Sequence, residues 1–124
     1  MTDPHTLLLA QIKVKYGALP GMRVWDNKTM GVWVGEKVGT SRGGHIVLRH
    51  ARFVKVGLTP GSCDLIGFAP GGKLLGIEGK TGGARPTKQQ KQFIELLNDS
   101  GCIAGVARDL DDVDKLLRRG SSLS

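Results

Sequence analysis

The chain has 124 residues, of which 40% are hydrophobic and 23% are charged, and its net charge is +7. This length and composition predict one globular domain over residues 1–124, and no apolar run approaches the roughly 20 residues that cross a bilayer, which argues against a membrane protein. An acidic residue and a proline stand where a secretory signal would be basic, so we expect an intracellular protein. The two cysteines, Cys63 and Cys102, have no metal-ligand spacing and are expected to be free buried thiols.

The positive charge predicts an anionic partner. A basic excess on a small domain attracts nucleic acid or anionic lipid, and few aromatic residues are available for stacking on single strands. Phosphate contacts by Lys and Arg are therefore the expected mode of binding. A basic protein without such a partner is the alternative.

The first part of the chain is predicted to contain a helix and several strands. An Asp-Pro pair followed by apolar residues predicts a helix over residues 4–16. Short runs of β-formers at 22–25 and 31–34 predict strands. The Gly- and Ser-rich stretch 35–44 predicts a mobile surface loop, and a partly buried strand or two with a basic flank is expected over 45–56.

An apolar hairpin with three charged residues follows. The runs 64–68 and 73–80 flank a Pro-Gly-Gly turn, and alternation along the second run places the side chains of Glu78 and Lys80 on one face. Asp64 comes near Glu78 because both lie at the end of the hairpin away from the turn. Taken alone this spacing is a weak signal, since a surface Glu-Lys pair is commoner than a site.

Two facing carboxylates beside an ammonium group predict a site for a divalent cation. Mg²⁺ prefers oxygen ligands and is commonly held by one or two carboxylates together with a substrate phosphate. The backbone carbonyl of Gly79 could add a ligand. Lys80 could position or deprotonate the attacking water, or stabilise negative charge on the phosphate, so the arrangement implies hydrolysis of a phosphodiester.

Two helices and a short strand are predicted after the hairpin. Thr87 has the capping-box spacing to Gln90 and predicts the start of a second helix. A strand is expected at 102–107, and Asp109 is expected to cap a last helix, followed by a polar, frayed tail at about 118–124. The order α, several β, α, β, α predicts an α/β fold with a central mixed sheet flanked by helices.

The residues around the hairpin resemble a known family. The segments GLTPGSCDLIG, LLGIEGK and PTKQQKQFIELLNDSGCIAGVARDLDDV are similar to the virus-type replication-repair nuclease domain (VRR-NUC), a branch of the PD-(D/E)xK superfamily, in its small stand-alone form from phages and bacteria. The resemblance covers about residues 56–113. It includes an acidic residue after a Gly-x-x tract, an E-x-K strand, a T-x-x-Q-x-x-F helix start and a G-x-x-x-x-V-A strand.

The resemblance implies a restriction-endonuclease-like PD-(D/E)xK core and a metal-dependent DNA endonuclease, in which homodimers act like Holliday junction resolvases on branched DNA. It implies that Asp64 and Glu78 bind Mg²⁺ or Mn²⁺, that Lys80 is the catalytic lysine, and that Gln90 belongs to the active-site helix. In a capping box the Gln90 side chain instead reaches back to the backbone of Thr87, and we expect that it cannot serve both roles fully. The cytoplasm of a bacterium or of a phage-infected host is the implied location.

The sequence departs from the family pattern at two positions. Cys63 stands where the superfamily has its proline, and the first helix lacks the glutamate that supports a metal in related nucleases. His5 lies at the corresponding place and is a candidate for that support or for a second metal site. A solvated histidine near the terminus is the alternative.

Basic residues are expected to hold the DNA. The candidates are Arg42, Arg49, Arg52, Lys55, Arg85 and Lys88. Other functions that fit the sequence are a non-catalytic DNA-binding module of the same fold, a non-selective duplex endonuclease and, less favoured, an enzyme acting on small phosphates. Retention of the three charged residues of the hairpin argues against a non-catalytic module.

Overall fold

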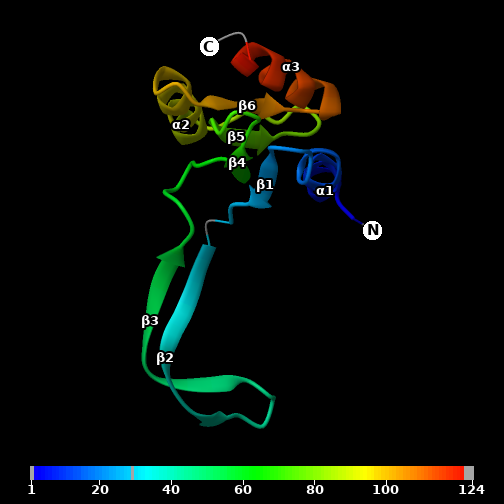
Figure 1. Cartoon of the computed structure of the whole chain (residues 1–124). Helices are drawn as coiled ribbons and strands as arrows, with labels where there is room; N and C mark the ends of the chain where they lie inside the picture. Colours follow the sequence, from blue (N-terminus) through cyan, green and yellow to red (C-terminus); the bar gives the residue numbers. More distant parts are fainter. Residues whose placement is uncertain (1, 29, 122–124) are drawn as a thin grey trace. The chain divides into compact units, whose positions relative to one another are not determined.

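The computed structural model describes residues 2–28 and 30–121 (Figure 1). Contacts divide the chain into two compact units. The first, Met1–Asn27 with Thr59–Ser124, is called the core unit, and the second, Lys28–Leu58, is called the hairpin arm. Among the described helices, none combines the length and the apolar character needed to cross a membrane.

The core unit has an α/β fold with a mixed sheet, as predicted. Its strands lie in the order β1-β4-β5-β6; β4 is antiparallel to β1 and to β5, whereas β6 is parallel to β5. The elements are α1 (Pro4–Tyr16), β1 (Arg23–Asp26), β4 (Leu65–Phe68), β5 (Leu74–Gly79), α2 (Lys88–Asp99), β6 (Ile103–Ala107) and α3 (Leu110–Ser121). The predicted first helix, apolar hairpin and later helices are therefore confirmed.

Each helix of the core unit begins with a side chain that satisfies a free backbone amide. The Asp3 carboxylate accepts a hydrogen bond from the Thr6 amide (3.1 Å), and the Thr87 hydroxyl accepts one from the Gln90 amide (3.1 Å). Asp109 accepts from the Asp112 amide (2.9 Å), as predicted for the last helix. These bonds fix where the helices start, because the first amides of a helix have no partner within it.

The last helix is longer than predicted. A frayed tail was expected from residue 118, but α3 continues to Ser121, and residues 122–124 lie outside the described part of the chain. Tertiary contacts explain the difference, since the Arg119 guanidinium donates to the Ala104 carbonyl (2.9 Å) and Gly120 packs closely against Ile103. Polar composition alone does not reveal such contacts.

Helices cover both faces of the sheet. A Cβ at Gly76 would lie 2.9 Å from Leu97 of α2, and a Cβ at Gly105 would lie 2.5 Å from Leu116 of α3. Because Gly76 pairs with Ala104, these two glycines face opposite sides, so α2 and α3 lie on opposite faces. The Tyr16 hydroxyl of α1 donates to the Leu110 carbonyl of α3 (3.0 Å), which joins those two helices on one face.

A side chain occupies the backbone groups of one residue on the free edge of β6. The Asn98 amide group donates to the Ala104 carbonyl (3.0 Å), and its oxygen accepts from the Ala104 amide (3.0 Å). These bonds occupy the backbone groups that another strand would use, which protects an exposed sheet edge from pairing with other chains.

The hairpin arm consists of β2 (Met30–Thr40) and β3 (Ile46–Val56), which pair antiparallel. The prediction of a loop at 35–44 is wrong for most of its length, because residues 35–40 continue β2. Two register shifts interrupt this half of the pairing: the first has an extra residue on β3 opposite Gly35, and the second has Val38 as the extra residue on β2. The pairing continues past both. The segment predicted at 45–56 forms one strand, mostly exposed rather than partly buried, since the arm is a single layer.

Candidate active site

Three charged residues meet at the end of the apolar hairpin away from its turn. Leu65 pairs with Ile77, so Asp64 and Glu78 are next to each other in the register, as predicted. The Lys80 amide donates to the Ala107 carbonyl (3.1 Å) and extends the pairing of β5 with β6 by one residue. The site therefore lies beyond the carboxyl ends of two parallel strands, where open α/β sheets commonly bind ligands.

Hydrogen bonds hold both the side chain and the backbone of Asp64. Its Oδ2 accepts hydrogen bonds from the Gly79 amide (3.0 Å) and from His5 Nε2–H (3.0 Å). The Asn27 amide donates to the Asp64 carbonyl (2.8 Å), and the Asn27 side chain donates to the Cys63 carbonyl (2.8 Å). The Asp64 side chain, 27% exposed, thus reaches the solvent from a fixed backbone.

His5 of α1 joins this group rather than lying free in solvent. Its Nε2 is 3.0 Å from Asp64 Oδ2 and 3.0 Å from the carbonyl oxygen of Gly79. A carbonyl oxygen has no hydrogen, so Nε2 carries the hydrogen in these contacts. The imidazole therefore touches two of the oxygen atoms that the sequence predicts as metal ligands.

The space around Gly79 is crowded. A Cβ there would lie 2.7 Å from Leu9 Cδ2 and 3.6 Å from both Asp64 Oδ2 and His5 Nε2. Any side chain would push against α1 and fill the space beside the carboxylate. The absence of a side chain lets Leu9, Asp64 and His5 approach the backbone of Gly79 closely.

Glu78 is a buried carboxylate with one unsatisfied oxygen. Its side chain is 2% exposed, Oε1 accepts from Gln90 Nε2–H (3.1 Å), and Lys80 Nζ lies 3.4 Å from Oε1. Oε2 is the one buried side-chain polar atom without a hydrogen-bond partner in the described residues. An unpaired charged oxygen is costly to bury, so a positively charged ligand at this place would be favourable.

Burial raises the pKa of Glu78 to about 7, with a further contribution from the nearby Asp64 carboxylate, while Lys80 lowers it. Burial, with smaller contributions from the same two carboxylates, raises the pKa of the Cys63 thiol to about 12. Cys63 is thus a neutral thiol near neutral pH, and it packs against Gly76 of β5. The prediction of free thiols is confirmed for both cysteines; Cys63 is buried, whereas Cys102 is partly exposed.

The Gln90 side chain contacts the backbone of Thr87 and the carboxylate of Glu78 at the same time. Its Oε1 accepts from the Thr87 amide (2.8 Å), which completes the capping box, and its Nε2–H donates to Glu78 Oε1 (3.1 Å). Contrary to the expectation, the capping contact does not prevent a contact with Glu78, because the oxygen and nitrogen of the amide point to different partners. The helix cap thereby orients Gln90 toward the buried glutamate.

The donors at this position fit a hard divalent cation. The described residues contain no cluster of three or more His, Cys, Asp or Glu side chains arranged to hold a metal ion. The site instead combines Asp64 with the Gly79 carbonyl, beside the unpartnered Oε2 of Glu78. Two carboxylates and a carbonyl are the oxygen ligands that Mg²⁺ and Mn²⁺ prefer.

The predicted DNA-binding residues are divided between the two units. Arg42 lies in the turn of the hairpin arm, and Arg49, Arg52 and Lys55 lie on β3. In the core unit, Arg85 lies in the segment between β5 and α2, and Lys88 is the first residue of α2.

Two further residues position the site, and sequence reasoning missed them. Asn27 fixes the backbone around Asp64, and Arg108 donates to the carbonyls of Gly82 (3.4 Å) and Ala84 (2.8 Å) in the segment that follows Lys80. Each acts on residues far away in the chain, and no local motif marks either one.

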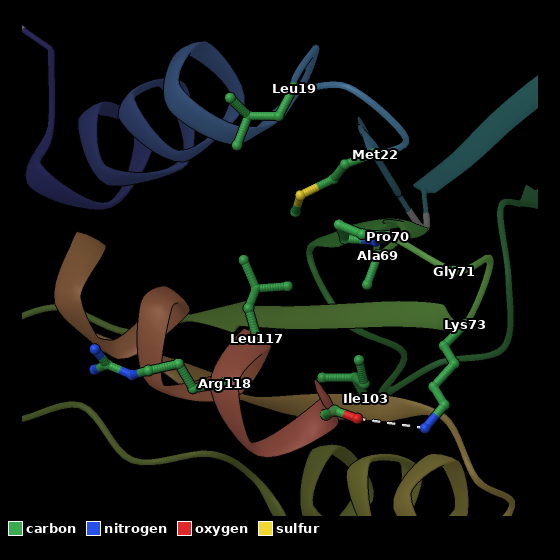
Figure 2. A pocket seen from close by; sticks show the side chains of 10 residues that line it. Leu19, Met22, Ala69, Pro70, Gly71, Lys73, Ile103, Leu117 and Arg118 are labelled. Atoms are coloured by element: carbon green, nitrogen blue, oxygen red, sulfur yellow. Dashed lines mark hydrogen bonds between the residues drawn. The ribbon is translucent and has the colours of Figure 1, made fainter. Parts of the chain in front are cut away.

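An apolar cavity lies elsewhere in the core unit. It has a volume of about 370 Å³, and Figure 2 shows apolar side chains such as Leu19, Met22 and Leu117 around it. Lys73 at its rim donates to the Gly120 carbonyl (3.3 Å). No carboxylate lines this cavity. A shallower depression of about 520 Å³ has Asp109 and Asp111 in its lining, together with Pro4 and Thr81, which are next to His5 and Lys80 in the chain.

Comparisons with known proteins identify no relative of this chain. No protein-family model matches it, and neither a functionally characterised protein nor a solved structure is significantly similar to it.

Proposed function

We propose that the chain is a DNA endonuclease of the PD-(D/E)xK type that hydrolyses phosphodiester bonds with Mg²⁺ or Mn²⁺. The observation that carries the proposal is the meeting of Asp64, Glu78 and Lys80 at one end of the sheet, with Glu78 Oε2 buried and unpartnered. A net charge of +7 favours a polyanionic substrate. The resemblance of residues 56–113 to VRR-NUC domains supports the same reaction.

Asp64, Glu78 and the Gly79 carbonyl would hold the cation. When bound, a divalent cation supplies Lewis-acid charge against the phosphate oxygens. The protein contributes orientation, because the Gly79 amide aligns Asp64 and the Gln90 amide group holds Glu78 in place. Both carboxylates therefore keep their positions without rearrangement of the backbone.

Lys80 supplies a second positive charge at the site. Its side chain is 15% exposed, and its Nζ lies 3.4 Å from Glu78 Oε1. An ammonium group held in a partly desolvated place stabilises negative charge that develops on a phosphate more strongly than one in water does. In this mechanism Lys80 donates to the phosphate in the transition state, while the contact with Glu78 Oε1 positions its ammonium group.

We further propose that two copies act together on branched DNA. Two sites related by a two-fold axis can cut paired strands symmetrically, which a single site cannot do in one encounter. Sedimentation at micromolar concentration should then give the mass of a dimer, and a monomer at that concentration would exclude the paired arrangement.

The test of the activity is cleavage of a circular plasmid, a four-way junction and a linear duplex in Mg²⁺, Mn²⁺ or EDTA. Wild-type protein should convert the plasmid to nicked or linear forms in either metal and leave it intact in EDTA. Asp64→Asn, which keeps the shape of the side chain, should be inactive and folded. If wild-type protein cuts none of these substrates in either metal, the proposal is wrong.

The same experiment separates two forms of the activity. A structure-selective enzyme cuts the junction faster than the linear duplex at equal concentration. Equal rates on both would leave a general duplex endonuclease.

Replacing Gln90 by glutamate tests the second role of this residue. The new carboxylate still accepts from the Thr87 amide, but it cannot donate to Glu78 and adds a negative charge beside it. We expect the cleavage rate to fall about 10- to 100-fold and the free energy of unfolding to fall by about 1 to 3 kcal/mol, because buried Glu78 Oε1 loses a donor. Initial rates in Mn²⁺ and thermal unfolding in EDTA measure the two effects.

Thr87→Ala is the matched control, because it removes the capping hydroxyl and leaves the contact between Gln90 and Glu78. It should lower stability by about 1 kcal/mol and preserve the rate. Equal losses of rate in the two variants would mean that Gln90 acts only through the helix cap.

A further inference from the structure

The hairpin arm carries most of the positive charge of the protein. Residues 28–58 contain six Lys and Arg residues and one acidic residue, a net charge of +5 out of +7 for the whole chain. The cations are Lys28, Lys37, Arg42, Arg49, Arg52 and Lys55, and the acid is Glu36. A unit of this charge is attracted to a polyanion and repels a second copy of itself.

Cations project from both faces of the arm. Arg52 lies opposite Val34, and Lys55 lies opposite Gly31. Residues that lie opposite each other share a face, and these two pairs are three residues apart along β2, so they point to opposite sides. A ribbon that is basic on both faces suits a space between two phosphate backbones better than adsorption through one face.

The arm keeps its shape through its own cross-strand contacts. Trp33 and Phe53 form an edge-to-face pair with ring centres 5.4 Å apart, and the Phe53 ring fills the space over Gly31. On the other face Val32 lies opposite Val54. At the tip, the Ser41 amide donates to the His45 carbonyl (2.7 Å), which closes the turn that carries Arg42.

We propose that the hairpin arm binds duplex DNA as a two-stranded ribbon inserted into the major groove. The major groove of B-DNA admits an antiparallel β-ribbon, and strands of 11 residues reach about 35 Å, roughly one turn of the duplex. Arg49, Arg52 and Lys55 contact the phosphates on the two sides of the groove. The proposal shares with the proposed function only the identity of the polyanion, since binding requires no hydrolysis.

The test measures binding of a labelled 24-base-pair duplex by fluorescence anisotropy in EDTA, where no cleavage occurs. The arm variant is Arg49→Ser, Arg52→Ser and Lys55→Ser together. At about 150 mM salt we expect its Kd to rise on the order of 100-fold, and the slope of log K against log salt to decrease by about 2 to 3. Circular dichroism checks that the variant is folded.

A matched variant of the core unit removes the same charge. The triple variant Lys15→Ser, Lys115→Ser and Arg118→Ser should raise Kd by no more than about threefold. These side chains lie on α1 and α3 of the core unit, outside the arm that is proposed to bind the DNA. Equal losses in the two variants would overturn the proposal and leave net charge as the explanation.

Competition identifies the groove. Methyl green, which occupies the major groove, should displace the protein, whereas netropsin, which occupies the minor groove, should not. Displacement by netropsin alone, or equal affinity for single-stranded DNA, would overturn the groove assignment. If the arm variant instead loses dimers and keeps its affinity for DNA, the arm binds a second copy of the chain and the proposal is wrong.

Failure of this proposal and failure of the nuclease proposal are distinguishable. A protein that binds duplex through the arm in EDTA but cuts no DNA in metal supports the first and refutes the second. If the arm variant cuts plasmid as efficiently as wild type, the nuclease proposal is supported and the proposal for the arm is refuted.

Discussion

Replacing Lys80 by methionine is expected to lower the rate of DNA cleavage about 10²- to 10³-fold, while DNA binding in EDTA changes little. Methionine keeps the apolar stem, which suits a side chain that is only 15% exposed, and removes the charge. The loss of rate arises because no ammonium group then faces the negative charge that develops on the phosphate. Single-turnover cleavage of plasmid in Mn²⁺ at saturating protein measures this step.

Lys115→Met is the matched control for this experiment. Lys115 Nζ also lies 3.4 Å from a carboxylate oxygen, that of Asp111, but the pair is on the exposed surface of α3. Its rate should stay within about twofold of wild type, since exposed pairs contribute little. A comparable loss in both variants would show that the effect is one of general charge.

The pH dependence of the Lys80→Met variant separates two explanations. Lys80 lowers the pKa of Glu78, so its removal keeps that carboxyl protonated to a higher pH. If the rate of the variant recovers fully at pH 9, Lys80 acts only by keeping Glu78 ionised, and the proposed contact with the phosphate is wrong. A loss that persists at pH 9 supports direct stabilisation of the phosphate.

The parts of the site that could be predicted from the sequence follow from local geometry. Alternation along β5 places Glu78 and Lys80 on one face, and a short turn brings Asp64 beside them. The capping box from Thr87 to Gln90 was also visible as a spacing. Each of these predictions needed only neighbours in the chain or the two strands of one hairpin.

The remaining contacts depend on packing between distant segments. His5 touches Asp64, which is 59 residues away, and Asn27 holds the backbone of Cys63, which is 36 residues away. Only the packing of α1 and β1 against the hairpin brings these side chains together. No local pattern marks a histidine or an asparagine for such a contact.

The hairpin arm shows a different limit of sequence reasoning. A stretch rich in glycine and serine indicates a loop when it is considered alone. Between residues 35 and 40, however, the partner strand β3 supplies the hydrogen bonds, and register shifts absorb the irregular positions. Pairing between strands therefore overrides the local preference of these residues.

Glu78→Gln is expected to make the metal-free protein more stable than wild type at high pH, at the cost of activity. Burial raises the pKa of Glu78 from 4.5 to about 7, so the folded state holds a proton at pH values where the unfolded state has released it. This contribution to stability is fully present below pH 4.5 and is lost as the pH rises through about 7. Glutamine keeps the shape of the side chain and has no charge to bury.

The measurement is the free energy of unfolding of both proteins in denaturant at pH 5 and at pH 8, with EDTA present. Each pKa unit corresponds to about 1.4 kcal/mol, so the difference between the variants should shift by about 2 to 3 kcal/mol in favour of glutamine between these pH values. Groups common to both proteins cancel in this difference. Saturating Mn²⁺ should reverse the order of stability of the two proteins at pH 8, because a cation that binds the native carboxylates stabilises wild type selectively.

A difference in unfolding free energy that is independent of pH would mean that burial does not raise the pKa of Glu78. If Mn²⁺ does not reverse the order of stability at pH 8, Glu78 gives no support to a metal site, because its unpartnered oxygen then has no role in binding a cation.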